Sequence, residues 1–500
     1  MIGSAAKYLT PKLPPYPGPY TVGSVEVEVP APWPAKYDAI GTAVETLLFR
    51  VFYPGSVTAD GAAEVHPYWF PGGNRDYIKD YVQFLGKSST IGSLLARVPF
   101  VADAVLPCLA NIPLLAPPSG HKWPVIVFSH GLGGTRNAYS QFCGSMASHG
   151  AIVIAPEHRD MSAPITYVRN YKDNTYSEIP YRRMMEVNET ARILRTFQLT
   201  QRVREVVSIV KVLLEQKIDL TPASTVNSRE PVSINPINFN WDFVDTTIEK
   251  VLYSGHSFGA ATTIAVVKGV HHLLDFLFQK PTDAVATNNT GNEEVPDSID
   301  QEYDPNDQFL RPHPSAGVVL LDPWLIPVYQ MMGIPLTVPA VANMSQSFYG
   351  WKSNMNLVYQ LLSNSAVPEK IRPKTDTGVH LFLTKPSVHH SQSDFALLFP
   401  SLTKYAFKLP ECTFETQTAV MNMNVAGCVE FLREYAGVQL FDVTGDADEG
   451  LVRTESKEHE EGSTETVSTG YLVAGGQIKG WSRLDVENDI TVVDILEGNT

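Results

Sequence analysis

The sequence has 500 residues, of which 44% are hydrophobic and 18% are charged, as is usual for a soluble globular protein. Its formal net charge of −15 excludes a general nucleic-acid binder, because binding to phosphates needs clustered Lys and Arg. Residues 281–310 hold eight acids and no base, and residues 442–500 hold fourteen acids and four bases. The rest carries only about +3, so the acidity lies in two segments that are predicted to be disordered.

Cysteine usage and the N-terminal sequence indicate a reducing compartment. The four cysteines show neither CxxC spacing nor a disulfide-dense pattern, which predicts buried thiols. No apolar segment near the N-terminus resembles a signal peptide, and Gly3 is not at the position that myristoylation requires. The uncharged stretch 323–351 contains four prolines, which predicts buried loop and strand rather than a membrane helix. We therefore expect a cytoplasmic protein, either free or peripheral to membranes.

Short apolar strands alternate with helices along the chain. Residues 1–40 are Pro-rich and predict an extended arm. Strands are predicted at 45–53, 124–128, 151–155, 250–254, 317–321 and 380–384, and helices near 139–149, over 186–216 and over 258–274. This order favours an α/β fold with a mainly parallel central sheet flanked by helices.

The predicted elements suggest one catalytic domain with two acidic additions. We expect this domain over residues 41–440, with a disordered insertion at 281–313 between a helix and a strand. An acidic tail follows at 441–500, in which the apolar stretches 471–478 and 490–496 are candidates for a short terminal hairpin.

A G-x-S-x-G motif at residues 255–259 (GHSFG) carries the strongest chemical signal. One chain of this length is expected to contain such a motif by chance roughly 0.2 times. The neighbouring predicted elements therefore decide whether the motif is meaningful. Here it follows the predicted strand KVLYS and opens the predicted helix FGAATTIAVVKGV. That arrangement is typical of the nucleophile elbow of α/β-hydrolases, in which a sharp turn lifts the serine above the sheet. The sequence therefore predicts Ser257 as a nucleophile.

Two backbone amides are expected to form an oxyanion hole. The loop SHGLGG at residues 129–134 directly follows the predicted strand PVIVF, and an HG-rich loop at this place supplies one backbone N–H. The second N–H should come from Phe258, the residue after the nucleophile. The alternative, a simple glycine-rich turn, is less consistent with the neighbouring elbow.

A carboxylate and then a histidine must follow the nucleophile in this chain order. Asp322 lies just after the predicted strand GVVLL, where the acid of such a triad is found, although turns and helix caps also use Asp there. His389 and His390 both follow a later strand, and either could act as the base by chemistry alone.

These motifs, taken in order, resemble the plasma-type platelet-activating factor acetylhydrolases. The matching segments are FSHGLGG, MASHGAIVIAPEHRD, YSGHSFGAATT, LLDPWLIP and SVHHSQSDF, within about residues 18–400. The resemblance implies an α/β-hydrolase fold with Ser257 as nucleophile, Asp322 as acid and His389 as base. It also implies that the amides of Leu132 and Phe258 form the oxyanion hole. The sequence departs from the family at His390, and the absent signal peptide resembles its intracellular branch.

The resemblance also implies a substrate and a possible lipid contact. It indicates a calcium-independent phospholipid esterase that cleaves a short sn-2 acyl ester and needs no metal or cofactor. Docking on membranes is expected near residues 88–101, where four apolar residues share one helical face: Ile91, Leu94, Leu95 and Val98. A helix packed on the core explains that pattern equally well.

Three alternatives remain at this point. The chain could be a general carboxylesterase or lipase on the same fold, or a non-catalytic relative that binds a lipid or a protein. The charged cluster EHRD at residues 157–160 could shape the mouth of a pocket, but we favour a structural ion-pair network. The scattered histidines His66, His271 and His272 show no metal-ligand pattern.

Overall fold

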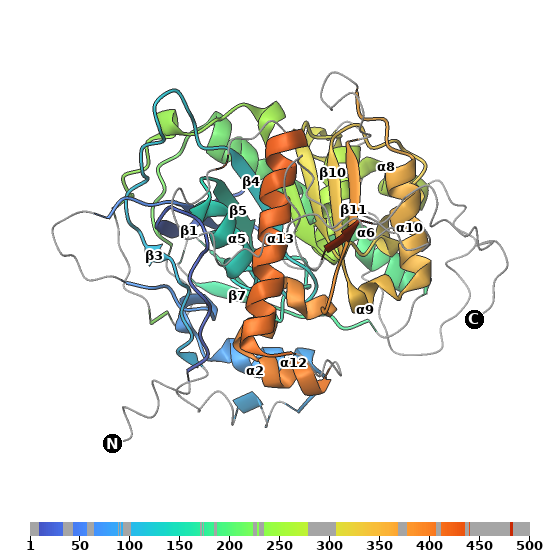
Figure 1. The fold of residues 1–500 in the computed structure, drawn as a ribbon. Coiled ribbons are helices and arrows are strands. Elements are labelled where there is room, and N and C mark those ends of the chain that lie inside the picture. The colour runs from blue at the N-terminus through green and yellow to red at the C-terminus, as the bar shows by residue number, and fades with distance from the viewer. Residues whose placement is uncertain are drawn as a thin grey trace, which may run out of the picture.

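A ten-stranded sheet forms the centre of the molecule (Figure 1). The computed structural model describes residues 10–33, 44–57, 65–88, 90, 92–93, 102–170, 173, 175–184, 188–223, 228–229, 235–278, 307–368, 378–406, 412–435, 440 and 481–483. The strands lie in the order β12 (Trp481–Arg483), β11 (Val379–Thr384), β10 (Ala340–Ser345), β9 (Gly317–Leu321), β8 (Leu252–His256), β4 (Val125–Ser129), β5 (Ile152–Pro156), β2 (Thr46–Pro54), β1 (Val22–Pro30) and β3 (Leu109–Ala110). The six strands β11, β10, β9, β8, β4 and β5 are parallel, whereas β12, β2 and β1 each pair antiparallel with a neighbour.

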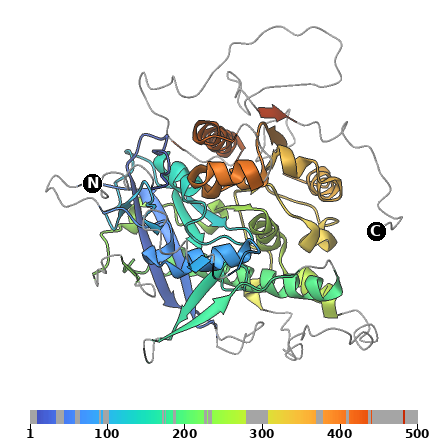
Figure 2. The same ribbon diagram turned by 90° about the horizontal axis from the view of Figure 1, so that it is seen from below.

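Helices cover both faces of this sheet, as the view from below shows (Figure 2). The described helices are α2 (Asp76–Phe84), α5 (Ser140–Ser148), α6 (Glu189–Val210), α7 (Phe258–Lys268), α8 (His271–Phe278), α9 (Gln346–Tyr349), α10 (Lys352–Ser363), α11 (Asp394–Leu398), α12 (Pro400–Ala406) and α13 (Phe414–Tyr435). Successive side chains of β4 point to opposite faces of the sheet. Val125 and Val127 pack in a core with residues of α6, α7 and α10. Ile126 and Phe128 pack in a second core with residues of α5 and α13. A separate hairpin joins β6 (Ile165–Arg169) to β7 (Tyr176–Pro180).

The predicted α/β-hydrolase fold with a mainly parallel sheet is confirmed, and all six predicted strands occur within two residues of their expected bounds. The helix predicted over 258–274 is two helices, because Gly269 has a φ of 85° and ends α7. The long helix predicted over 186–216 ends in a π-helical turn at Lys211–Glu215. Part of the predicted N-terminal arm was wrong, since β1 pairs with β2 inside the sheet.

The structure describes only the last part of the predicted insertion at 281–313. Residues 279–306 lie outside the described residues, but residues 307–313 pack on the body. Asp307 forms an ion pair with Arg204 at 3.0 Å, and the His313 Nδ1 lies 2.6 Å from the Tyr253 hydroxyl oxygen. The candidate hairpin stretches 471–478 and 490–496 also lie outside the described residues, whereas β12 between them pairs antiparallel with β11.

The four cysteines are free and buried, as predicted: Cys108, Cys143, Cys412 and Cys428. In the part of the chain that the structure describes, no helix combines the length and the hydrophobicity needed to span a membrane. The uncharged stretch 323–351 forms β10 together with short helices, in line with its prolines.

Candidate active site

Ser257 occupies the sharp turn between β8 and α7. Its φ of 56° and ψ of −117° lie outside the regions that side-chain-bearing residues normally adopt. The backbone holds this conformation at both ends, because the Ser257 amide donates to the Leu321 carbonyl at 2.9 Å and its carbonyl accepts from the Trp324 amide at 3.2 Å. The sharp strand-to-helix turn predicted around Ser257 is thus present.

The two glycines of the motif make this turn possible. A Cβ on Gly259 would lie 1.9 Å from the carbonyl oxygen of Ser129, and a Cβ on Gly255 would lie 2.4 Å from the carbonyl carbon of Gly259. The first of these contacts shows that α7 begins directly against the SHGLGG loop after β4. The elbow and the predicted oxyanion loop are therefore packed as one unit.

Asp322 and His389 meet at the same edge of the sheet. Asp322 directly follows β9 and has a φ of 42°, and His389 follows β11. The Asp322 Oδ2 accepts from His389 Nδ1 at 3.0 Å, and the carboxylate also accepts from the Ser345 amide at 2.5 Å and the Ser345 hydroxyl at 2.6 Å. Because Nδ1 carries the donated proton, the Nε2 of His389 is left with a lone pair that can accept one.

Two aromatic rings fix the plane of His389. Phe348 stacks on its imidazole with a centroid distance of 4.3 Å and an interplanar angle of 13°, and the His256 ring lies 4.3 Å away. The His389 amide also donates to the Ser347 hydroxyl at 3.0 Å. Burial lowers the pKa of His256 well below its usual range, so this neighbour stays neutral beside His389.

His390 lies apart from the Asp322 carboxylate. Its ring packs near Phe395 with a centroid distance of 5.7 Å, and its backbone carbonyl accepts from the Ser393 hydroxyl. Desolvation, with a smaller contribution from the neighbouring His389, lowers the pKa of His390 to about 3. Of the two histidines that the sequence left open, His389 is therefore the one hydrogen-bonded to Asp322.

The SHGLGG loop presents one amide beside Ser257. Its glycine amides are occupied: Gly131 donates to the Tyr139 hydroxyl at 3.3 Å, Gly133 to the Ser162 carbonyl at 2.8 Å, and Gly134 to the Gly131 carbonyl at 3.1 Å. Within the described residues, the intervening Leu132 amide donates no hydrogen bond.

The SHGLGG loop lies close to Ser257. A Cβ on Gly131 would lie 3.2 Å from the Ser257 Cβ. Phe258 is the first residue of α7, and the amides of a first helical turn have no intrahelical acceptor. The amides of Leu132 and Phe258 are thus both available next to Ser257.

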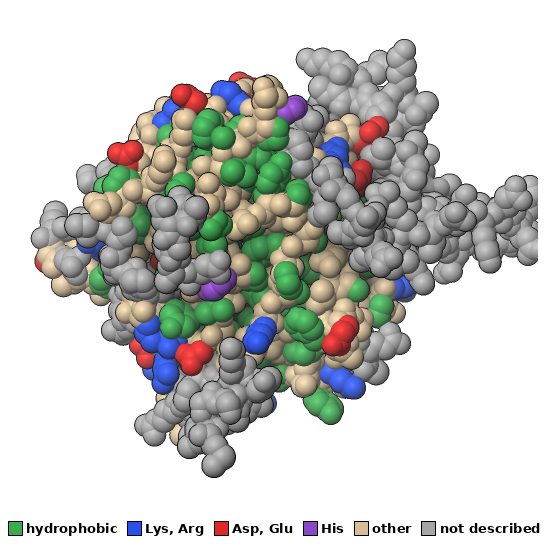
Figure 3. Space-filling view, turned by 60° about the vertical axis from the view of Figure 1, so that its left-hand side comes forward, with side chains coloured by type: hydrophobic (Ala, Val, Ile, Leu, Met, Phe, Trp, Pro, Cys, Tyr) green, Lys and Arg blue, Asp and Glu red, His purple; other side chains and the backbone are tan. Residues whose placement is uncertain are grey.

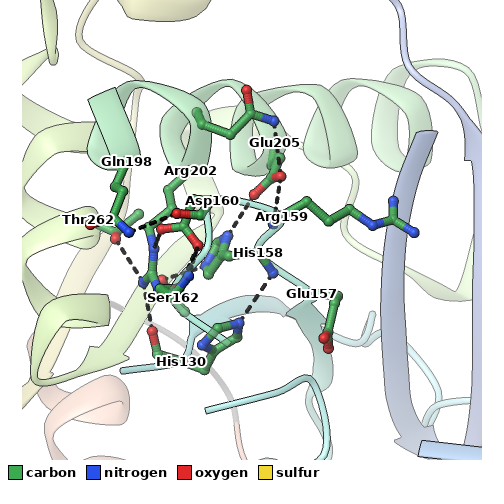
Figure 4. Close-up of polar contacts among 12 residues, drawn as sticks. His130, Glu157, His158, Arg159, Asp160, Ser162, Gln198, Arg202, Glu205 and Thr262 are labelled. Carbon is green, nitrogen blue, oxygen red and sulfur yellow. Dashed lines mark hydrogen bonds and ion pairs between the residues drawn. The ribbon is translucent and has the colours of Figure 1, made fainter. Parts of the chain in front are cut away.

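The EHRD cluster at residues 157–160 is fully buried, with each side chain at most 1% exposed. Its ion pairs join Glu157 to Arg136, Arg159 to Glu28 and Asp160 to Arg202. Figure 4 shows His158 and Asp160 beside Glu205 and Arg202 of α6, whereas the Arg159 side chain extends away from His130. The structural interpretation of the cluster is confirmed, and a place at the mouth of a pocket does not fit its burial.

Two groups of side chains in the described part of the chain bring metal-ligating atoms within 4.8 Å of one another. One is His256, Asp322 and His389, whose carboxylate is already hydrogen-bonded. The other is His271, His272 and Asp275 at the start of α8, where His271 Nδ1 lies 3.2 Å from the Leu310 carbonyl. The second group was not predicted, because its three side chains come together only on the helix α8. His66 Nδ1 is bound to the Leu106 and Cys108 carbonyls instead.

The predicted docking face falls largely outside the described residues, since Ile91, Leu94, Leu95 and Val98 are not among them. Several residues of the site had no signal in the sequence. Ser345 and Phe348 reach it because β10 ends at this edge of the sheet, and Tyr139 reaches it because α5 begins there.

Comparisons with known proteins point to one family. A family model described as "Platelet-activating factor acetylhydrolase, isoform II" matches residues 5–454. A putative phospholipase A2 of Schizosaccharomyces pombe is 27% identical over 467 residues, covering 89% of this chain and 96% of that protein. Platelet-activating factor acetylhydrolases are similar at 27% identity in Gallus gallus (80% of this chain, 78% of that protein) and 26% in Cavia porcellus (84% and 77%).

Among solved structures, a ferulic acid esterase from Streptomyces cinnamoneus aligns with a TM-score of 0.45 at 12% identity, over 85% of this chain and 94% of that one. An α/β-hydrolase sheet with a serine on a strained strand-to-helix turn defines an esterase-type hydrolase. The chain belongs to the platelet-activating factor acetylhydrolase isoform II family, as the sequence motifs had indicated.

Proposed function

We propose that this esterase hydrolyses the short sn-2 acyl ester of phospholipids of the platelet-activating factor type. The observation that carries the proposal is the hydrogen bond from His389 Nδ1 to Asp322, formed beside the strained Ser257 elbow. The substrate class is supported by the family and by the names of the relatives in Gallus gallus and Cavia porcellus.

The proposed reaction proceeds through an acyl-enzyme. The Ser257 oxygen attacks the ester carbonyl while His389 Nε2 takes its proton, and Asp322 stabilises the resulting imidazolium. The amides of Leu132 and Phe258 donate to the oxyanion. The imidazolium then protonates the departing lysophospholipid oxygen, and a water molecule deprotonated by His389 releases the short carboxylic acid and frees Ser257. Every proton in this cycle passes through His389, so no cofactor is required.

Peripheral contact with a lipid surface is part of the proposal, together with the cytoplasmic location predicted from the sequence. On the face shown in Figure 3, hydrophobic side chains lie among polar ones and charged groups are sparse. Elsewhere in the described chain, Leu402 and Tyr405 of the short helix α12 are 47% and 79% exposed. Exposed apolar side chains of this kind suit shallow insertion between lipid headgroups.

The decisive experiment compares hydrolysis of 2-acetyl- and 2-palmitoyl-phosphatidylcholine by the wild type and by Ser257→Ala. We expect the wild type to prefer the acetyl ester and the variant to be inactive on both. Equal rates on simple acyl esters and on both phospholipids would favour a general carboxylesterase or lipase. Failure of a fluorophosphonate probe to label Ser257 would favour a non-catalytic binding protein.

A further inference from the structure

Arg202 is a fully buried arginine in the middle of α6 whose guanidinium reaches the SHGLGG loop (Figure 4). Its Nε donates to Asp160 Oδ2 at 2.6 Å, and one terminal nitrogen donates to the His130 carbonyl at 2.6 Å. The other terminal nitrogen donates to the Ser162 hydroxyl at 2.5 Å. The Nε and both terminal nitrogens of the planar guanidinium group therefore each donate a hydrogen bond.

The bond to His130 fixes the peptide unit that precedes the Leu132 amide. The carbonyl of this unit accepts from Arg202, and its N–H, which belongs to Gly131, donates to the Tyr139 hydroxyl at 3.3 Å. A peptide unit held at both ends cannot rotate, which matters because glycine gives the following backbone wide freedom. The approach of the chain to Leu132 is thus set by Arg202 and Tyr139.

The backbone just after Leu132 is connected to the same arginine through Ser162. The Gly133 amide donates to the Ser162 carbonyl at 2.8 Å. The Ser162 hydroxyl accepts from Arg202 and donates to Asp160, and Asp160 in turn pairs with Arg202. Both sides of the Leu132 amide are therefore anchored to a single buried ion pair.

Arg202 also contacts the second oxyanion residue. Its guanidinium carbon lies 4.5 Å from the centroid of the Phe258 ring, a cation–π distance, and a terminal nitrogen lies 3.4 Å from the Thr262 hydroxyl one turn further along α7. One side chain thus bridges the loop that carries Leu132 and the helix that begins at Phe258.

We infer that Arg202 is a positioning residue of the oxyanion hole, which sets the Leu132 amide relative to the Phe258 amide. The inference rests on the proposed function, because it concerns the donors of that reaction. Donors act on a developing oxyanion only when they are held in place beforehand, and a misplacement of about 1 Å can cost ~10²-fold in rate. Lysine keeps the charge but cannot reproduce the planar fork.

The test is Arg202→Lys, with Arg159→Lys as the matched control. Arg159 is equally buried and lies in the same cluster, but its side chain binds Glu28, Thr46 and the Tyr167 carbonyl, away from the elbow. We expect kcat on 2-acetyl-phosphatidylcholine to fall about 10²-fold in Arg202→Lys with KM within about threefold of the wild type. Arg159→Lys should keep kcat within about threefold.

Inhibitor binding separates positioning from general damage. A trifluoromethyl ketone, which forms an oxyanion with Ser257, should bind Arg202→Lys more weakly by the same factor as kcat/KM falls. A non-hydrolysable sn-2 ether lipid should bind it as it binds the wild type. Equal loss of affinity for both ligands, or an equal loss of kcat in Arg159→Lys, overturns the inference.

A milder variant and a parallel control complete the experiment. If Arg202→Lys does not fold, Ser162→Ala is measured in its place. This variant removes one hydrogen-bond acceptor of the Arg202 guanidinium and should lower kcat several-fold at unchanged KM. Unchanged kcat in that variant counts against the inference. Ser257→Ala is measured alongside: an active Ser257→Ala overturns the proposed function itself, whereas an inactive one with a normal Arg202→Lys overturns only the role of Arg202.

Discussion

In the part of the protein that the structure describes, two sets of serine, histidine and carboxylate can be compared, one at the edge of the sheet and one buried beneath α6. The outer set is Ser257, His389 and Asp322, and the buried set is Ser129, His158 and Glu205. In the buried set, the Ser129 hydroxyl lies 2.8 Å from His158 Nε2, and His158 Nδ1 lies 2.8 Å from Glu205 Oε2. The 2.8 Å between His158 and Glu205 is shorter than the 3.0 Å between His389 Nδ1 and Asp322 Oδ2, so a histidine–carboxylate hydrogen bond alone does not identify a catalytic site.

Protonation distinguishes the two sets. Burial, reinforced by the nearby Asp160, raises the pKa of Glu205 to about 8, and burial lowers the pKa of His158 well below its usual range. At neutral pH, Glu205 therefore donates its proton to His158 Nδ1, and His158 Nε2–H donates to Ser129. Because Glu205 is then a neutral carboxylic acid, the buried set has no negative charge to stabilise an imidazolium. His158 therefore cannot act as a base for Ser129.

Backbone and exposure distinguish them as well. Ser129 ends the regular strand β4, whereas Ser257 occupies a strained turn with positive φ. All three side chains of the buried set are at most 2% exposed, while His389 is 27% exposed. Under the proposed function, the features that single out the outer set are the strained turn, the two amides without acceptors and solvent access, in addition to a hydrogen bond.

The largest expected difference between the sets is the effect of removing each serine. Ser257→Ala should lower kcat by about 10⁴- to 10⁶-fold without unfolding the protein, because it removes the nucleophile. Ser129→Ala should keep kcat within about tenfold and lower the free energy of unfolding by about 1 kcal/mol, since only one buried hydrogen bond is lost. Steady-state kinetics and denaturant unfolding measure both. Comparable kinetic losses would show that the buried set takes part in the reaction.

The two adjacent histidines provide a sharper test of the outer set. His389→Ala should lower kcat about 10⁴-fold, because it removes the base bound to Asp322. His390→Ala should have a far smaller effect, because its ring packs on Phe395 instead. Kinetics of both variants on 2-acetyl-phosphatidylcholine decide the matter. An inactive His390→Ala beside an active His389→Ala would transfer the role of base.

The sequence predicted the outer set because its members follow short apolar strands. In a parallel sheet, the carboxyl ends of such strands meet at one edge, so Ser257 after β8, Asp322 after β9 and His389 after β11 had to converge. The choice between His389 and His390 came from the family resemblance, because chain position alone cannot show which way neighbouring side chains turn.

The buried set was beyond sequence reasoning. Its members come from β4, the turn after β5 and the middle of α6, and their pairing depends on how α6 packs on the sheet. The pairing of β1 with β2 was missed for the same reason, since it depends on long-range packing. The break at Gly269 did have a local signal, because a glycine with positive φ commonly ends a helix.

Packing between the elbow and the SHGLGG loop can be tested at Gly259. A Cβ there would lie 1.9 Å from the Ser129 carbonyl oxygen, so Gly259→Ala must push α7 away from the loop. We expect a loss of about 1–3 kcal/mol in the free energy of unfolding and a kcat lower by about 10²-fold. Gly333→Ala is the control, because nothing lies within 4 Å of the Cβ it adds. Normal activity in Gly259→Ala would separate the loop from the reaction.

The smallest expected effect is the pH dependence that Glu205 gives to stability. Because its folded pKa of about 8 exceeds the unfolded value, its contribution is complete below about pH 4.5 and is lost as pH rises toward 8. Between pH 6.5 and 8, Glu205→Gln should therefore make the slope of unfolding free energy against pH less negative by up to about 1.4 kcal/mol per unit. Denaturant unfolding measures the slope, with the exposed Glu415→Gln as control. Identical slopes would mean that folded Glu205 is ionised and the buried set is charged.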